Sequence, residues 1–142
     1  MKKDDKHLLQ EMILKSRLSA ECMEQIGSRA DKEMADCLSK EVIHVLRLQE
    51  KSLSAMVEQN GSINYNYLSQ EKKEKKRIKR STLFNTSHTH LAEIVIKDNM
   101  NYLADIWTAM KKYENASPYV IEIAREFTDF EEEMIEKMKT FL

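Results

Sequence analysis

The feature that most restricts the fold of this chain is its scarcity of turn-forming residues, with Gly 2 and Pro 1 among 142 residues. β-Rich and loop-rich folds need many such residues at their turns, so this chain has few places at which to reverse direction. Charged residues make up 33% of the chain, and the frequent Leu, Met, Glu and Lys favour helices. We therefore expect an all-α fold, in a single domain of residues 1–142 that is long enough to bury a core.

A few helix-ending signals divide the chain. Four helices are expected, over about residues 5–26, 29–58, 87–114 and 118–142. Gly27 ends the first helix, and Ser28 and Asp31 resemble a capping box that opens the second. Ser117 and Pro118 suit the cap and first position of the last helix. The helices on either side of each short corner are expected to be antiparallel neighbours.

The middle connection, over about residues 59–86, is much longer than usual between two helices. Its stretch INYNYLSQ lacks a helical apolar stripe, and STLFNTS is rich in small polar residues that favour caps. A connection of this length can return along the bundle, so that the second and third helices run parallel. The alternative is an up-down-up-down bundle in which residues 71–80 extend the third helix as a solvated arm. We favour the crossover.

Glu41-Val-Ile-His44 is the motif that most suggests chemistry, because Glu-x-x-His places two metal ligands on neighbouring sides of a helical turn. At about 100° per residue, Glu41 falls within the buried arc of its helix, with His44 at the margin. Glu131 falls on the buried stripe of the last helix, whereas Glu21 lies opposite the buried face of the first. Reflection of the helices about their corners predicts a buried polar layer near mid-bundle. Its members are Ser16, Ser19, Glu41, Asn99 and Glu131, with His44 beside it.

Length, connectivity and this motif make the chain resemble the ferritin-like superfamily, which includes ferritins and rubrerythrins. The resemblance implies a four-helix bundle with a long crossover between helices 2 and 3. It also implies metal ligands of one glutamate from each of two helices and Glu-x-x-His from the other two. Glu41 and His44 match one such unit, and Glu131 matches the glutamate of the second, where Met134 replaces histidine. The first helix offers no inward glutamate, and the third offers Asn99 or His88 in place of one. The implied site is a degenerate one for iron, manganese or zinc at Glu41, His44 and Glu131, although a protein without any cofactor is the favoured interpretation.

The segment KKEKKRIKR carries seven basic residues against one acid. The basic residues are Lys72, Lys73, Lys75, Lys76, Arg77, Lys79 and Arg80. Such a run can contact nucleic acid, anionic lipid or an acidic partner, or simply face water. It lacks interleaved aromatic residues, and the formal net charge of -1 argues against a wholly basic nucleic-acid binder. Docking on the acidic stretch 129–136, within the chain or between subunits, is also open.

Two cysteines and two histidines remain as candidates. Cys22 and Cys37 are nearly symmetric about the first corner, so they can face each other and bind copper(I) or zinc or oxidise together. Buried free thiols are the favoured interpretation. His88 and His90 lie about 200° apart on a helix, so they cannot chelate one ion from a helix, whereas from a loop they could.

Taken together, these patterns favour a non-enzymatic bundle that works through protein–protein contacts, as a homodimer or with another helical protein. Self-association is suggested by apolar residues outside the buried stripes, namely Leu14, Leu18, Ile43 and Leu46. The alternatives are the degenerate metal site and the binding of nucleic acid or an acidic partner through residues 72–80. No signal peptide and no run near the ~20 apolar residues of a membrane span is visible, so a cytoplasmic location is expected.

Overall fold

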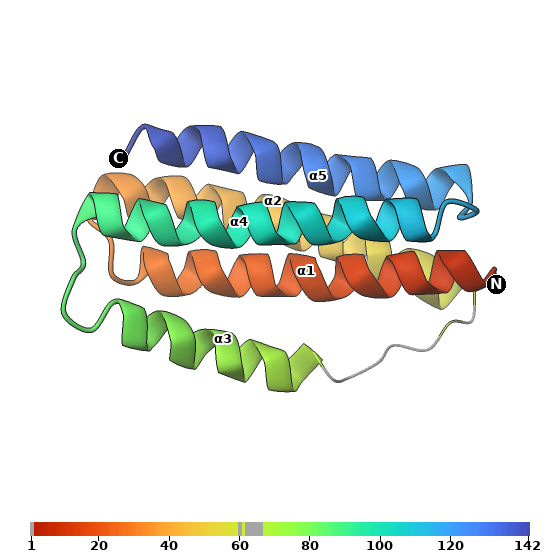
Figure 1. The fold of residues 1–142 in the computed structure, drawn as a ribbon, viewed down its shortest axis with the longest axis horizontal. Coiled ribbons are helices and arrows are strands. Elements are labelled where there is room, and N and C mark those ends of the chain that lie inside the picture. The colour runs from red at the N-terminus through yellow and green to blue at the C-terminus, as the bar shows by residue number, and fades with distance from the viewer. Residues whose placement is uncertain (1, 60, 62–66) are drawn as a thin grey trace.

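The computed structural model describes residues 2–59, 61 and 67–142, which form five helices and no strand (Figure 1). The helices are α1 (Lys3–Gly27), α2 (Lys32–Glu58), α3 (Tyr67–Ser81), α4 (His88–Lys112) and α5 (Pro118–Lys139). The all-α prediction is confirmed. The expectation of four helices is incomplete, because α3 is a further helix within the segment that was expected to be a connection. Of the stretch INYNYLSQ, residues 63–66 lie outside the described part of the chain.

The four long helices lie side by side, and α3 lies outside them against α1 (Figure 1). α1 packs on α2 and α4, α5 packs on the same two helices, and α1 also contacts α5. The chain runs out along α2, returns through α3 and runs out again along α4, so α2 and α4 point the same way (Figure 1). Residues 82–87 separate α3 from α4, so the alternative in which residues 71–80 extend the next helix as an arm is wrong.

The helix starts differ slightly from the predicted ones. Asp31 is the N-cap of α2 and accepts a hydrogen bond from the Met34 amide (3.1 Å), so the helix begins at Lys32 and not at residue 29. The side chain of Ser117 does not cap α5; its hydroxyl donates to Asp5 (2.7 Å), and its amide donates to the other oxygen of that carboxylate (2.5 Å). Asp5, which is buried, therefore links the start of α1 to the start of α5.

The buried face of α3 is mostly polar. Ile78 is fully buried, and it is the one buried apolar residue of α3 among the side chains that the structure describes. Glu71, Glu74 and Ile78 lie on the same side of the helix, because successive members are three and then four residues apart. Polar contacts must therefore supply much of the attachment of α3, because one isoleucine buries little apolar surface.

The side of α1 that was predicted to face water is covered by α3. Glu21 was expected opposite the buried face, but it is 4% exposed, and its carboxylate pairs with Lys75 of α3 (3.6 Å). Arg17 likewise pairs with Glu71 (3.3 Å). A helical wheel identifies a buried side by its apolar residues. The burial of Glu21 does not show in the wheel of α1, because α3 covers this side mainly through ion pairs.

The apolar residues that suggested self-association are mostly covered. Leu18 is buried, and Leu14 and Leu46 pack against the core as partly buried residues. Ile43 alone of the four is exposed, at 56%. Among the described residues, no helix is long and apolar enough to cross a membrane.

Candidate functional site

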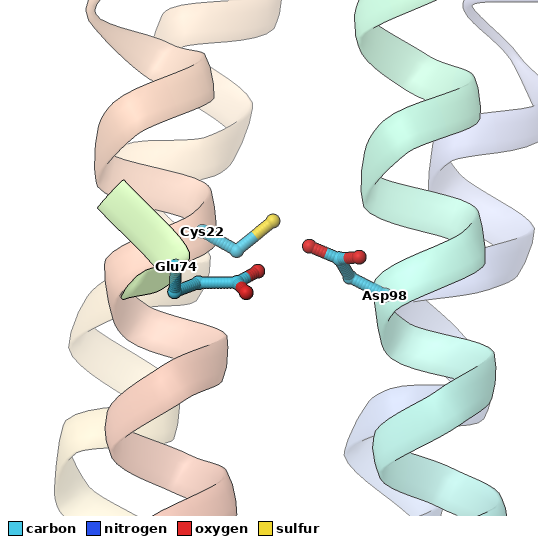
Figure 2. A group of neighbouring side chains, drawn as sticks. All are labelled: Cys22, Glu74 and Asp98. Atoms are coloured by element: carbon cyan, nitrogen blue, oxygen red, sulfur yellow. The ribbon is translucent and has the colours of Figure 1, made fainter. Parts of the chain in front are cut away.

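Three ionisable side chains that can bind a metal converge where α3 faces α1 and α4. Cys22 of α1, Glu74 of α3 and Asp98 of α4 point toward one another (Figure 2), with one ligand atom of each within 4.8 Å of the others. Cys22 is fully buried, and Asp98 is 7% exposed. Ile78, one helical turn beyond Glu74, is buried beside this cluster on the same side of α3, so its burial turns Glu74 inward.

Arg77 supplies the positive charge of this cluster. Its guanidinium donates to Glu74 (2.5 Å) and also to the carboxylate of Asp98. The hydroxyl of Tyr102 on α4 donates to Glu74 as well (3.2 Å). Arg77 thus links α3 to α4 through Asp98, and it lies between the carboxyl groups of Glu74 and Asp98, which would otherwise repel each other.

The two carboxyl groups differ in their affinity for a proton. Burial raises the pKa of Asp98 to about 7, and the adjacent Glu74 adds to this rise. Burial acts on Glu74 in the same direction, but hydrogen bonds from Arg77 and Asp98 outweigh it and lower the pKa of Glu74 overall. The pair therefore keeps a proton on Asp98 up to about neutral pH. Burial, with Asp98 as a second cause, raises the pKa of Cys22 well above its ordinary value, so this thiol is protonated and is a poor nucleophile.

The donor set suits a zinc-type metal only after a rearrangement. A thiolate and two carboxylates are ordinary zinc ligands, at about 2.3 Å for sulfur and 2.0–2.2 Å for oxygen. Ligand atoms up to 4.8 Å apart would need to draw closer. Arg77 would also need to leave Asp98, because it occupies the carboxylates that the ion would bind.

The structure places the predicted metal ligands in two different environments. Glu41 pairs with Lys137 (2.5 Å) and lies 3.8 Å from His44. His44 is exposed, with its ring edge-to-face against Phe130 (4.8 Å between centroids). Among the described residues, Glu41, His44 and Glu131 do not form a group of converging ligand atoms. Glu41 lies at the margin of the core, where a lysine can reach it, and not in its centre.

Part of the predicted polar layer does assemble, around Glu131. The Ser19 hydroxyl donates to the fully buried Glu131 carboxyl (2.8 Å), and Asn99 is also fully buried. Ser16 is buried too, but its hydroxyl donates to the carbonyl oxygens of its own helix at Met12 and Ile13. Glu41, the remaining predicted member, is not part of this layer.

Glu131 is neutral at pH 7 because burial raises its pKa to about 8. Its second oxygen and both polar atoms of the Asn99 side chain have no hydrogen-bond partner among the described residues. One carboxyl, one amide and one hydroxyl supply at most one anionic ligand, whereas the paired-metal pattern uses four glutamates and two histidines. These residues therefore do not fit the paired-metal centre of the ferritin-like pattern.

The seven basic residues of the segment divide into an inner and an outer group. Lys75 and Arg77 form the ion pairs described above. The other five are exposed and pair with no acid that the structure describes; we call them the basic face of α3. They are Lys72, Lys73, Lys76, Lys79 and Arg80. Docking on residues 129–136 of the same chain is not observed, because α3 packs on α1 and α5 lies on the far side of the molecule (Figure 1).

The remaining candidates have local partners. Cys22 and Cys37 are both free thiols, and Cys22 belongs to the cluster with Asp98 while Cys37 is half-buried near Glu41. His88 pairs with Asp31 (2.5 Å), and His90 hydrogen bonds to the carbonyl oxygen of Ser81 (2.8 Å). These two histidines therefore help to position the ends of neighbouring helices.

The cluster of Cys22, Glu74 and Asp98 was not predicted from the sequence. One signal was present, since Glu74 is the single acid among the basic residues and stands four positions before the single isoleucine. That spacing predicts one side of a helix with Glu74 and Ile78 together. Comparison of the chain with family models, curated proteins and solved structures gives no match.

We expect Glu131 to make the protein less stable as pH rises. Its pKa is raised from 4.5 in the unfolded chain to about 8 in the fold, so its contribution is fully present below pH 4.5 and is lost as pH increases toward 8. Glu131→Gln keeps an acceptor for Ser19 but cannot ionise. Urea unfolding at about pH 5 and pH 8 should show the wild type losing ~2–4 kcal/mol more than this variant does.

Glu132, the exposed neighbour of Glu131, provides the control for the urea unfolding experiment. Glu132→Gln should leave the pH dependence of the wild type unchanged, because Glu132 faces water. Equal pH dependence in the wild type and Glu131→Gln would show that Glu131 does not hold a proton in the folded state.

Proposed function

We propose that this chain is a non-enzymatic helical protein that binds an acidic partner through the basic face of α3. The observation that carries the proposal is the sorting of charge on this helix. Its acids Glu71 and Glu74 face inward and are paired, whereas five cations face outward without a partner among the described residues. The acidic partner would complete the ion pairs that the fold leaves open.

The spacing of these cations supports a single contact surface. Lys72 and Lys73, Lys76, and Lys79 and Arg80 recur every three or four residues, so they form one stripe along about 12 Å of helix. The net charge of the whole chain is -1, so the stripe is a local feature and not a consequence of a basic composition. A local stripe of this kind steers an anionic surface to one side of the protein.

We also propose a ferritin-like connectivity for the four long helices. The parallel course of α2 and α4, and the crossover that contains α3, support it (Figure 1). Within this proposal the crossover carries the binding helix α3, and the buried Glu131 and Asn99 would correspond to metal-ligand positions of the ferritin-like pattern.

Neutralisation of the basic face tests the proposed function. Binding of fluorescein-labelled poly-L-glutamate should be measured by anisotropy at low and at physiological salt. The triple variant Lys72→Gln, Lys73→Gln, Lys76→Gln should bind about tenfold more weakly, because three ion pairs of ~0.2–1 kcal/mol each are lost. Binding should also weaken as salt increases.

The matched control removes the same charge elsewhere. Lys32, Lys40 and Lys111 are exposed lysines of other helices and form no ion pair with described residues. Their triple glutamine variant should bind like the wild type. Equal loss in both variants, or no binding by the wild type at low salt, would contradict the proposal.

A second candidate function is the binding of a zinc-type ion by Cys22, Glu74 and Asp98. The specific observation is the convergence of one thiol and two carboxyls from three helices (Figure 2). Binding would require the protons of Cys22 and Asp98 to be released, because the pKa of each is raised. It would also free Arg77 from its buried contacts, so the ion would take over the link between α3 and α4.

Zinc titration against a competing chelator tests this second candidate. The wild type and Cys37→Ser should bind one equivalent with release of protons, whereas Cys22→Ser should lose the site, because the thiolate is its softest ligand. The same affinity in both cysteine variants, or no stoichiometric zinc in the wild type, would rule out this candidate.

A further inference from the structure

α5 carries an acidic stripe on its outer side. Residues 126–136 contain no lysine or arginine. Their exposed acids recur at spacings of three and four, which places them on one side of the helix over roughly 10 Å. We call them the acidic face of α5: Asp129, Glu132, Glu133 and Glu136. Glu136 pairs with Lys139 of its own helix (2.7 Å), and the other three form no ion pair with described residues.

The acidic face of α5 matches the basic face of α3 in length and spacing. Each is a stripe of about two helical turns with charges three or four residues apart. Two helices that lie along each other can therefore align several opposite charges at once, which gives more attraction than isolated surface pairs do. This match links the basic face to an acidic face in which three of the four acids form no ion pair with described residues.

The two faces cannot meet within one molecule. α3 packs on α1, and α5 packs on α4 and α2, at opposite edges of the molecule (Figure 1). Each copy therefore presents one basic and one acidic face in different directions. Because the net charge is only -1, two copies have little overall repulsion to overcome.

We infer that the basic face of α3 docks on the acidic face of α5 of a second copy. This inference rests on the proposed function, because it names the acidic partner as the chain itself. The contact is head-to-tail, with different surfaces on the two sides, so each pair of copies still offers one free face of each kind. Such contacts build open chains or closed rings and not a two-fold dimer.

Nucleic acid and anionic membranes fit the observations less well. Neither would make use of the acidic face of α5, and the basic face has no aromatic side chain among its cations on which bases could stack. The exposed Phe84, 97% accessible and just beyond α3, would suit a membrane surface, so vesicles belong among the test conditions. Of these three partners, only a second copy of the chain would engage both the basic face of α3 and the acidic face of α5.

Mixing of two complementary variants tests the inference. The α3-neutral variant is Lys72→Gln, Lys73→Gln, Lys76→Gln, and the α5-neutral variant is Asp129→Asn, Glu132→Gln, Glu133→Gln. In sedimentation velocity at low salt, the wild type should form a concentration-dependent series of oligomers that dissociates as salt is added. Each variant alone should be monomeric. Their equimolar mixture should form a one-to-one complex and nothing larger, because only one matching pair of faces remains.

Two controls test whether loss of association comes from the charged faces and not from unfolding or from loss of charge in general. Circular dichroism should show wild-type helix content in both variants, and the Lys32, Lys40 and Lys111 glutamine variant should associate like the wild type. A mixture that stays monomeric, or an α5-neutral variant that associates like the wild type, would overturn the inference.

The poly-L-glutamate assay separates this failure from failure of the proposed function. The α5-neutral variant should keep full poly-L-glutamate binding, since its basic face is intact. If the wild type is monomeric but binds poly-L-glutamate, the second copy is wrong as partner and the basic face still stands. If it is monomeric and binds phosphatidylserine vesicles or a short DNA duplex through the same lysines, the partner is that anion and the inference is also overturned.

Discussion

The bridge from Arg77 to Glu74 and Asp98 fixes the position of α3. It thereby determines which charged side chains of α3 face outward. α3 has one buried isoleucine, so apolar packing alone gives it little preference for one side over another. A buried carboxyl group is costly without a hydrogen-bond partner, and Arg77 donates to two such groups at once, Glu74 and Asp98. The orientation of α3 is therefore set by charge pairing.

This orientation has a direct consequence for the outer surface. With Glu71 and Glu74 turned inward and paired, no acid of α3 remains beside the outer lysines to neutralise them. The outer side of α3 therefore carries charges of one sign only. The proton on Asp98 is part of the same arrangement, since it spares the cluster a second full negative charge near neutral pH.

The long helices were predictable from sequence because each carries an apolar stripe and clear end signals. Gly27, Ser117 and Pro118 end or begin helices close to where the structure has them. The docking of α3 was not predictable in this way, since its partners lie on α1 and α4 and only one apolar residue marks its inner side. Glu131 was correctly expected in the core, because it lies in the centre of a wide apolar stripe. Glu41 lies at the edge of its stripe, where Lys137, distant in sequence, decides its environment.

Hydrogen exchange of the α3 backbone tests the central claim most directly, by comparison of Arg77→Gln with Arg80→Gln. Both variants remove one arginine from the same helix, but Arg80 is exposed and unpaired with any described residue. In the wild type and in Arg80→Gln, amides of residues 71–81, which lie beyond the first turn of α3, should be protected. In Arg77→Gln they should exchange much faster, while those of α4 remain protected, because the link to Asp98 is lost. Equal protection of α3 in the two variants would contradict the account, as would an α3 that is unprotected in the wild type.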